Sequence, residues 1–533
     1  MSRAVLVTGG AAGIGWAAAQ RFAAAGDRVM IADIDAAAAE ARAATLGPAH
    51  AAIGADVARP ETAERVVAAC RARFGRLDVL VNNAGVIDSG GTMITDQPLD
   101  AFRRLLAINL LGMERMSLAA HAVMRSQAPY APDAAQGVAA PPMNAPGWRE
   151  APAADLPRGV IVNLASGAAF RAIPLRNGYS ASKAGVVAMT RAFGVAWARE
   201  GIRVNALAPG YIRTDLVAEL IAKGRVDPAR VERRVPLGRM GRPEEMAACI
   251  HFLAGPGAAG MAGGVLIADG ASAVFGAADD AAIRRGADPR AAPPGRPAVV
   301  VAGADTALGA ACLAGLPAHG FDVAGVAAGD AAGVEAAARR FGRLDALVNA
   351  AGTDAPIPPA APPGGRETGG ASAPGSEAAS GTAAAIERQL EAQFLAGQGA
   401  GRVMLAQGYG AVVNLTGIGG LAAGLGPPGD GIADAAVGML TRSMACEWGG
   451  SGIRANALAV CPLAPASAAG RFGAALPGRR LPTGRPITPA SVVAAVAFLL
   501  SPDSGYVSGA IVALDGGASH YAGPDLTPSQ AIP

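Results

Sequence analysis

Short apolar runs alternate with longer, Ala-rich stretches of mixed polarity along the first half of the chain. The runs that we interpret as strands are Ala4–Thr8, Arg28–Ala32, Val79–Asn82, Val160–Leu164, Arg203–Leu207 and Val265–Ile267. Strands that are apolar on both faces are typical of a parallel sheet whose two faces are covered by helices. Because helical stretches separate these strands, the pattern predicts a doubly wound α/β domain.

The same pattern occurs again in the second half. The segment VLVTGGAAGIG from Val5 is matched by VVVAGADTALG from Val299, and FGRLDVLVNNAG from Phe74 by FGRLDALVNAAG from Phe341. The offset falls from 294 residues at the first pair to 267 at the second, so the second copy lacks about a helix and a strand after its second strand. A chain of 533 residues is also too long for one ordinary core. We therefore predict two tandem Rossmann-like domains, each with a doubly wound parallel sheet.

Segments rich in Pro, Ala, Gly and Ser divide the chain further. Such segments bury too little apolar surface to offset their chain entropy, so we expect them to be flexible. The predicted organisation is a first domain at 1–275 with a flexible insert at 127–158, a linker at 276–296, a second domain at 297–521 with a flexible segment at 353–383, and a disordered tail at 522–533.

Composition and charge narrow the class of protein. The net charge is only +3, which gives no electrostatic argument for nucleic acid or an anionic membrane as a partner. No apolar run approaches the ~18 residues of a transmembrane helix, and no secretory leader is apparent. The five cysteines are scattered and never form CxxC, which indicates reduced, mostly buried thiols. We expect a cytoplasmic protein.

The first candidate site is the segment TGGAAGIG after the first strand. Gly9, Gly13 and Gly15 allow a tight turn and let backbone amides approach a pyrophosphate at a helix N-terminus. Asp33 ends the second strand, where a carboxylate accepts the ribose hydroxyls of NAD and repels the 2′-phosphate of NADP. A strand-end turn is the competing interpretation of Asp33, and Asp35 is placed to do the same work. The sequence therefore favours NAD over NADP.

The second candidate site combines a tyrosine, a lysine and a serine. Tyr179 and Lys183 stand four residues apart on a predicted helix and project from one face. A neighbouring ammonium stabilises a phenolate and lowers the tyrosine pKa, which is ~10 in isolation. Ser166 follows an apolar strand, and its hydroxyl is placed to hydrogen-bond a substrate carbonyl oxygen. Tyr-xxx-Lys alone is common on solvated helices, whereas its position after this strand makes it a candidate for acid–base chemistry.

These motifs, with NNAG at Asn82–Gly85 and NALAPGYIRT at Asn205–Thr214, resemble the short-chain dehydrogenase/reductase family over nearly all of residues 1–275. The resemblance implies hydride transfer between a nicotinamide and a secondary alcohol or ketone, with Tyr179 as general acid/base, Ser166 at the substrate oxygen and Lys183 at the ribose. It adds Asn109 as a fourth catalytic position. The cofactor contacts that it implies are Gly9, Gly13, Ile14, Gly15, Asp33, Asp56, Val57, Asn83, Gly85, Tyr179, Lys183, Pro209, Ile212 and Thr214. Residues 211–235 would cover the substrate.

The second copy has lost the reactive side chains. Tyr179 and Lys183 are replaced by Asp430 and Asp434, which we interpret as a solvated helix face rather than as a metal or acid site. Further replacements are Gly13 by Ala307, Asn83 by Ala350, Asn109 by Gln393, Ser166 by Gly417 and Pro209-Gly210 by Val460-Cys461. We expect a catalytically inactive partner domain.

In the resembling family the helices around 100–125 and 178–200 form a four-helix dimer interface. The second copy is expected to supply that interface within one chain, as a pseudo-dimer, with further homodimerisation left open. Two other functions stay open: an NADPH-dependent 3-oxoacyl-thioester (acyl-carrier-protein) reductase, and a nicotinamide-binding sensor or scaffold without turnover. The sequence does not identify the substrate, and it points to no metal.

Overall fold

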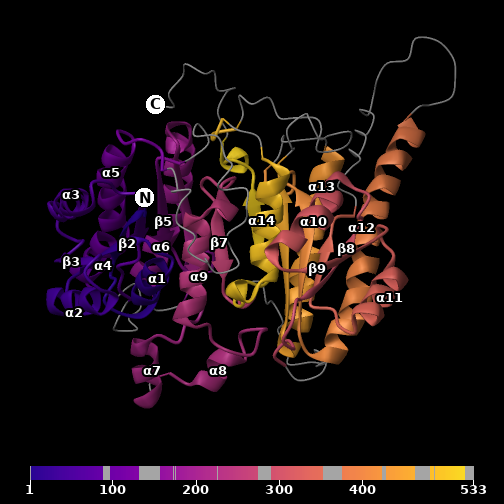
Figure 1. Cartoon of the computed structure of the whole chain (residues 1–533), viewed down its shortest axis with the longest axis horizontal. Helices are drawn as coiled ribbons and strands as arrows, with labels where there is room; N and C mark the ends of the chain where they lie inside the picture. Colours follow the sequence, from indigo (N-terminus) through magenta and orange to yellow (C-terminus); the bar gives the residue numbers. More distant parts are fainter. Residues whose placement is uncertain are drawn as a thin grey trace, which may run out of the picture.

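Two parallel sheets lie side by side along the long axis of the molecule (Figure 1). The computed structural model describes residues 2–87, 97–130, 157–171, 173, 176–224, 226–273, 290–351, 375–422, 428–461, 481–484 and 487–521. The first sheet has seven strands in the order β3-β2-β1-β4-β5-β6-β7, and the second has six in the order β13-β12-β11-β10-β8-β9. The prediction of two tandem doubly wound α/β domains is confirmed.

The first domain is built from β1 to β7. Its elements are β1 Ala4–Thr8, α1 Gly13–Ala24, β2 Arg28–Asp33, α2 Ala36–Leu46, β3 Ala51–Gly54, α3 Thr62–Phe74, β4 Val79–Asn82, α4 Leu99–Leu106, a π-helix Ala107–Leu111, α5 Gly112–Met124, β5 Gly159–Leu164, α6 Asn177–Trp197, β6 Ile202–Pro209, α7 Asp215–Ala222, α8 Pro228–Glu232, α9 Pro243–Ala254 and β7 Val265–Ala268. Strands β1, β4, β5 and β6 are buried along their whole length because helices cover both faces of the sheet.

All six predicted strands of the first domain are present, within two residues at either end. The sequence interpretation missed β3, whose residues AAIG are half-buried at the edge of the sheet. Alanine and glycine have low strand propensity, and an edge position lacks the burial that makes inner strands so apolar. Its pairing with β2 fixes the end of β2 at Asp33, opposite Gly54.

The second domain repeats this order with one strand fewer and, among the described residues, without counterparts of α2, α7 and α8. Its elements are β8 Ala298–Ala302, α10 Ala307–Gly315, β9 Asp322–Val326, α11 Ala331–Phe341, β10 Ala346–Asn349, α12 Gly375–Gln407, β11 Gly410–Gly417, α13 Pro428–Trp448, β12 Ile453–Val460, α14 Pro489–Leu500 and β13 Ile511–Leu514. Strand β9 is an edge strand, so the counterpart of β3 is absent, as the change of offset predicts.

Several predicted flexible segments fall largely outside the described residues: 131–156, 274–289, 352–374 and 522–533. The prediction of a flexible segment at 353–383 is wrong for residues 375–383, because they belong to α12. The two ends of the first-domain insert are held together, since the amide of Tyr130 donates to the Pro157 carbonyl at 3.1 Å. The five cysteines are free, and all except Cys446 are buried. Among the described helices, none is long and apolar enough to span a bilayer.

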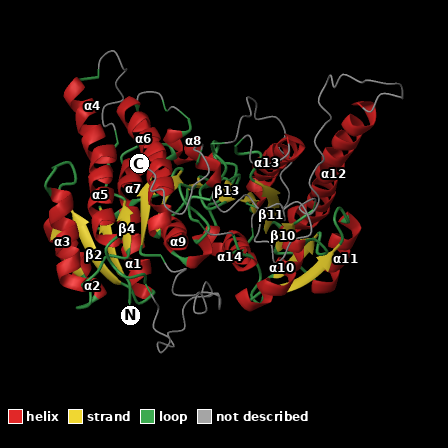
Figure 2. Ribbon diagram, turned by 90° about the horizontal axis from the view of Figure 1, so that it is seen from above, coloured by secondary structure: helices red, strands yellow, loops and turns green. Residues whose placement is uncertain are grey.

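The two domains pack through α9 and β7 on one side and α14 and β13 on the other (Figures 1 and 2). The rings of Phe252 and Phe498 stack with centroids 3.9 Å apart, and Arg21 pairs with Asp503 at 2.5 Å. The expected four-helix bundle is therefore wrong. Helices α5 and α12 lie on opposite flanks of the molecule, and Leu118 of α5 is 45% exposed. The contact between the domains is made instead by apolar side chains of α9 and α14, such as Phe252 and Phe498.

Candidate active site

The candidate residues of the first domain gather at the carboxyl ends of its central strands. The glycine turn follows β1, Asn83–Gly85 follows β4, Ser166 follows β5 and the segment Tyr211–Thr214 follows β6. Because these strands are parallel neighbours, the four segments meet at one edge of the sheet. That edge is where open α/β sheets bind ligands.

The glycine turn has no room for side chains. A Cβ on Gly15 would lie 2.2 Å from the Gly9 carbonyl oxygen and 2.5 Å from Asn83 Nδ2. Gly13 has a φ of 53°, which L side chains rarely adopt. Helix α1 begins there, and Ala12 before it provides no side-chain cap. The first amides of α1 are thus open toward this edge, an arrangement that fits a pyrophosphate.

Asn83 joins β4 to the glycine turn. Its Nδ2 donates to the carbonyl oxygens of Thr8 (3.0 Å) and Gly9 (2.9 Å), and its amide donates to Thr8 Oγ1 at 3.0 Å. Thr8 was not singled out from the sequence, although it is the polar residue that ends an apolar strand. Gly85 lies beside the candidate catalytic residues, where a Cβ would be 3.2 Å from Asn109 Oδ1 and 3.6 Å from Lys183 Nζ.

Asn109 lies in the π-helix between α4 and α5 and is fully buried. Its Nδ2 donates to the Val86 carbonyl and its Oδ1 accepts from the Val86 amide, both at 2.8 Å. Nδ2 also contacts Ser182 Oγ at 3.2 Å. Single π turns within α-helices recur at functional sites. The sequence identified Asn109 only by resemblance, because nothing in its neighbourhood predicts the extra turn.

Ser166, Tyr179 and Lys183 lie together. Tyr179 is hydrogen-bonded to Ser166. Lys183 is 4% exposed, and its ammonium donates to the Leu164 carbonyl at 2.7 Å and lies 5.8 Å from the centre of the Tyr179 ring. The spacing of four residues on α6 puts both side chains on one face, as predicted.

The electrostatics of this group differ from the expectation. Burial raises the pKa of Tyr179 above its ordinary value, and the hydrogen bond from Ser166 and the charge of Arg176 oppose that rise. Burial lowers the pKa of Lys183 to about 8. The net pKa of Tyr179 is therefore raised in the protein alone, because desolvation of the phenolate outweighs the Ser166 hydrogen bond and the Arg176 charge, and the lowering of this pKa by Lys183 stays a prediction. The sequence missed Arg176, three residues before the tyrosine.

Asp33 faces the glycine turn from the end of β2. Its Oδ2 accepts from the Ala11 amide at 3.0 Å. Arg42 of α2 donates from Nε to the Ala11 carbonyl at 3.1 Å, and its guanidinium lies 4.7 Å from the centre of the Trp16 ring. Asp35 caps α2 through the Ala38 amide instead. The local sequence of the turn contains no basic residue, but Arg42 reaches the turn from the next helix.

The remaining predicted contacts surround the same edge. Asp56 is half-buried and accepts from the Ala58 amide at 3.0 Å. Ile14 packs against the core, and Pro209 ends β6. Thr214 caps α7, and its Cγ2 lies 3.4 Å from where a Cβ on Gly13 would be, which places it beside the glycine turn.

The equivalent positions of the second domain are not a solvated surface. Asp430 is 7% exposed and Asp434 3%, so the interpretation as a solvated helix face is wrong. Asp434 accepts hydrogen bonds from the Thr416 hydroxyl (2.8 Å) and from the amides of Gly417 (2.9 Å) and Gly419 (3.2 Å). The Asp434 carboxylate thus anchors the end of β11 and the loop after it, which in the first domain is the loop that carries Ser166.

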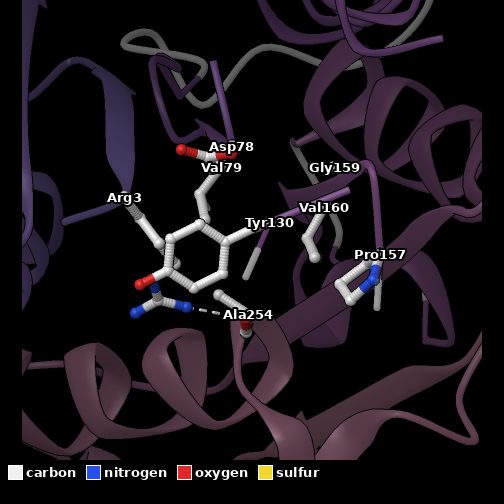
Figure 3. Close-up of a pocket in the computed structure, with 8 residues that line it drawn as sticks. All are labelled: Arg3, Asp78, Val79, Tyr130, Pro157, Gly159, Val160 and Ala254. Atoms are coloured by element: carbon white, nitrogen blue, oxygen red, sulfur yellow. Dashed lines mark hydrogen bonds between the residues drawn. The ribbon is translucent and has the colours of Figure 1, made fainter. Parts of the chain in front are cut away.

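A separate small pocket lies at the opposite edge of the first sheet, near the start of β1, β4 and β5. Figure 3 shows the Tyr130 ring beside Arg3, whose guanidinium donates to the Ala254 carbonyl. Its volume of about 10 Å³ is at the lower limit for a single water molecule. This pocket is too small and too far from the reactive side chains to be part of the site.

Comparison with protein families agrees with this arrangement. The family model described as Enoyl-(Acyl carrier protein) reductase matches residues 149–271 and 306–519, and the one described as short chain dehydrogenase matches residues 3–129. The matches extend over both domains. The chain therefore belongs to the short-chain dehydrogenase/reductase family, a family of oxidoreductases.

Three curated relatives illustrate the similarity. The chain is 37% identical over 270 residues to an uncharacterised short-chain type dehydrogenase/reductase of Sinorhizobium fredii, covering 50% of this chain but only 43% of that protein. It is 34% identical to 2-(R)-hydroxypropyl-CoM dehydrogenase of Xanthobacter autotrophicus (51% of this chain, 98% of that one). It is 36% identical to a sorbitol dehydrogenase of Cereibacter sphaeroides (48% and 91%).

Among solved structures, that of gox2181 is 31% identical and covers 51% of this chain and 96% of its own, with a TM-score of 0.44. A 3-ketoacyl-(acyl-carrier-protein) reductase from Brucella melitensis, complexed with NADH, is 28% identical, with a TM-score of 0.43 and coverage of 51% and 98%.

Proposed function

We propose that the first domain transfers a hydride between NAD(H) and a secondary alcohol or ketone, and that the second domain is a catalytically inactive structural partner. The observation that carries this proposal is the group of Ser166, Tyr179 and Lys183 at the sheet edge beside an uncapped glycine turn. Several relatives are named as dehydrogenases of polyols or other alcohols, which supports this class of substrate.

The proposed chemistry follows from the positions of these side chains. When bound, the nicotinamide supplies or accepts the hydride at the substrate carbon. Tyr179 exchanges the proton of the substrate oxygen, and the Ser166 hydroxyl donates a hydrogen bond to that oxygen. The Lys183 ammonium would supply a positive charge beside the pair, although burial lowers its pKa to about 8. Asn109 keeps the segment after β4 in place through Val86.

NAD is the proposed cofactor, with NADP less favoured. The Asp33 carboxylate is held at the turn by Ala11, where it would accept ribose hydroxyls and repel a 2′-phosphate. Arg42 beside it is the one feature on this turn that favours a phosphate. The alternatives of an NADPH-dependent 3-oxoacyl-thioester reductase and of a sensor without turnover differ from the proposal in cofactor and in activity.

Titration calorimetry of the whole chain with NADH and, separately, with NADPH tests the proposal. We expect one NADH per chain and markedly weaker NADPH, followed by NAD reduction with a panel of secondary alcohols and polyols. Two NADH per chain would contradict the inactive second domain. Tight NADPH would favour the thioester reductase, and binding without turnover across alcohols and ketones would favour the sensor.

A further inference from the structure

The backbone contact between the two domains follows a pseudo-two-fold axis. When α9 is aligned on α14, Gly260 falls on Tyr506 and Gly270 falls on Gly516. The Gly270 amide donates to the Tyr506 carbonyl at 3.0 Å, and the Gly516 amide donates to the Gly260 carbonyl at 2.7 Å. The same hydrogen bond thus occurs once in each direction.

The side chains at this contact break the symmetry. The Tyr506 ring packs on Gly241, where a Cβ would lie 2.6 Å from Tyr506 Cδ1. In the reverse direction the small residue is Gly260, and a Cβ there would lie 2.6 Å from Cδ1 of Ile487, which aligns with Gly241. At these symmetry-related positions the second domain therefore projects a tyrosine toward the first domain, whereas the first domain presents only a glycine in return.

The Tyr506 side chain reaches the segment that leads from β6 into the candidate site. Its hydroxyl lies 3.2 Å from the Tyr211 carbonyl oxygen and 3.3 Å from that of Arg239, and the residue is fully buried. The Gly241 amide donates to the same Tyr211 carbonyl at 2.9 Å, and the Arg213 amide donates to the Gly241 carbonyl at 2.8 Å. The Tyr506 hydroxyl thus contacts both backbone segments next to Ile212, the one at Tyr211 and the one at Arg239.

Arg239 holds the tyrosine ring in turn. Its guanidinium lies 5.3 Å from the centre of the Tyr506 ring, donates to the Gly505 carbonyl at 3.2 Å and pairs with both oxygens of Glu245 at 2.6 and 2.9 Å. Backbone carbonyls of the first domain and a half-buried ion pair therefore hold the Tyr506 side chain in place, which is a preorganised arrangement.

We propose that Tyr506, from the inactive domain, is a positioning residue for the nicotinamide end of the cofactor site in the first domain. This inference rests on the proposed function and on the family resemblance, which implies that Ile212 and Thr214 lie near the nicotinamide carboxamide. Tyr506 acts through Tyr211 and touches neither cofactor nor substrate. The adenosine end, at Asp33, is formed entirely by the first domain and does not depend on Tyr506.

The test compares two ligands that share an adenosine end. Tyr506→Phe, in the full chain, keeps the ring on Gly241 and removes only the hydroxyl. Calorimetry should give about five-fold weaker NADH, the effect of one lost buried hydrogen bond, with unchanged affinity for ADP-ribose, which lacks the nicotinamide. Asp503→Asn is the matched control, because Asp503 lies on the same segment but binds Arg21, and its NADH affinity should equal that of the wild type.

Equal NADH affinity in Tyr506→Phe would overturn the positioning role. Equal weakening of both ligands would also overturn it, because it would report a general loss of structure, which the melting temperature would show as well. Tyr506→Ala, which also removes the ring, should weaken NADH further and still spare ADP-ribose. A wild-type chain that binds ADP-ribose but not NADH would instead refute the proposed function.

Discussion

The two domains place opposite charges at the same point of one fold. In the first, the Lys183 ammonium donates to the Leu164 carbonyl. In the second, the equivalent Asp434 accepts from the Thr416 hydroxyl and from two backbone amides of the following loop. The lysine donor is replaced by an aspartate acceptor, and the loop after β11 supplies hydrogen-bond donors to that aspartate. The reactive position of the second copy was rebuilt as a structural one.

The carbonyl equivalent to that of Leu164, which accepts from Lys183 in the first domain, has a different hydrogen-bond donor in the second domain. Leu415 is the equivalent of Leu164, and its carbonyl accepts from Gln393 Nε2 at 3.2 Å. The same nitrogen donates to the Ala351 carbonyl at 2.9 Å. A buried carbonyl without a donor costs about 1–3 kcal/mol, so losing the lysine required this replacement. Gln393 now lies where strands β10 and β11 end.

The positions that both copies keep are hydrogen-bond hubs of the core. Arg203 donates to the carbonyls of Leu253, Gly255 and Ala258, at and just after the end of α9. Its equivalent Arg454 donates to three carbonyls at the end of α14, and to the Ser504 hydroxyl and the Val507 carbonyl. Burial lowers the pKa of both guanidinium groups to about 10, still charged at neutral pH. The second copy has thus kept the buried arginine that stabilises the fold and has lost the side chains proposed to perform the chemistry.

The largest effect that would separate the copies is on turnover. Tyr179→Phe removes the proposed proton carrier and should lower kcat by about 10²–10⁴-fold with NADH affinity within about two-fold of wild type. Asp430→Asn, at the equivalent position of the second domain, should leave kcat per folded chain unchanged. Steady-state kinetics and calorimetry on both variants make the measurement. Full activity in Tyr179→Phe would refute the mechanism.

The shared positions should instead respond alike. Arg203→Gln and Arg454→Gln each leave several buried carbonyls without a donor, and each should lower the free energy of unfolding by about 3 kcal/mol or more. Denaturant unfolding that resolves the two domains would measure this. A small effect in the second domain alone would mean that its core is no longer under the same constraint.

The fold was readable from the sequence because its strands are buried on both faces. Six strands of the first domain follow from their apolar runs, and the missing strand of the second from a change of offset. Strand β3 and the π-helix were not readable, because an Ala-rich edge strand and a turn widened by one residue leave no pattern in the side chains.

The candidate site was predictable where motifs are local and not where partners are distant. Ser166 and Tyr179 stand close in sequence, and their hydrogen bond follows from one strand and one helix. Arg42 reaches the glycine turn from α2, and Tyr506 reaches the β6 segment from another domain, so neither follows from spacing. The interdomain contact depends on which apolar faces bury more surface, and this depends on the folded shapes of both domains.

Cofactor choice should respond moderately to the pair at the glycine turn. Asp33→Asn keeps an acceptor for the Ala11 amide but removes the negative charge, so NADH should bind about ten-fold more weakly and NADPH more tightly. Adding Arg42→Gln should abolish the gain in NADPH affinity, because the remaining cation at the turn is lost. NADPH binding that is indifferent to Arg42 would exclude this arginine from the choice.

The smallest expected effect concerns pH. The charge of Arg176 opposes the burial that raises the pKa of Tyr179, so Arg176→Gln should raise that pKa further. Alcohol oxidation needs the deprotonated tyrosine, so its rate increases with pH, and a higher pKa moves that increase to higher pH. We expect a small displacement, since the interaction is partly screened by solvent. Arg230→Gln, which changes an exposed arginine of α8, should leave the profile of kcat/KM against pH unmoved. A profile that does not move in Arg176→Gln would mean that burial and the Ser166 hydrogen bond alone set the pKa of Tyr179. The loss of Arg176 from the second domain would then have no bearing on the loss of its chemistry.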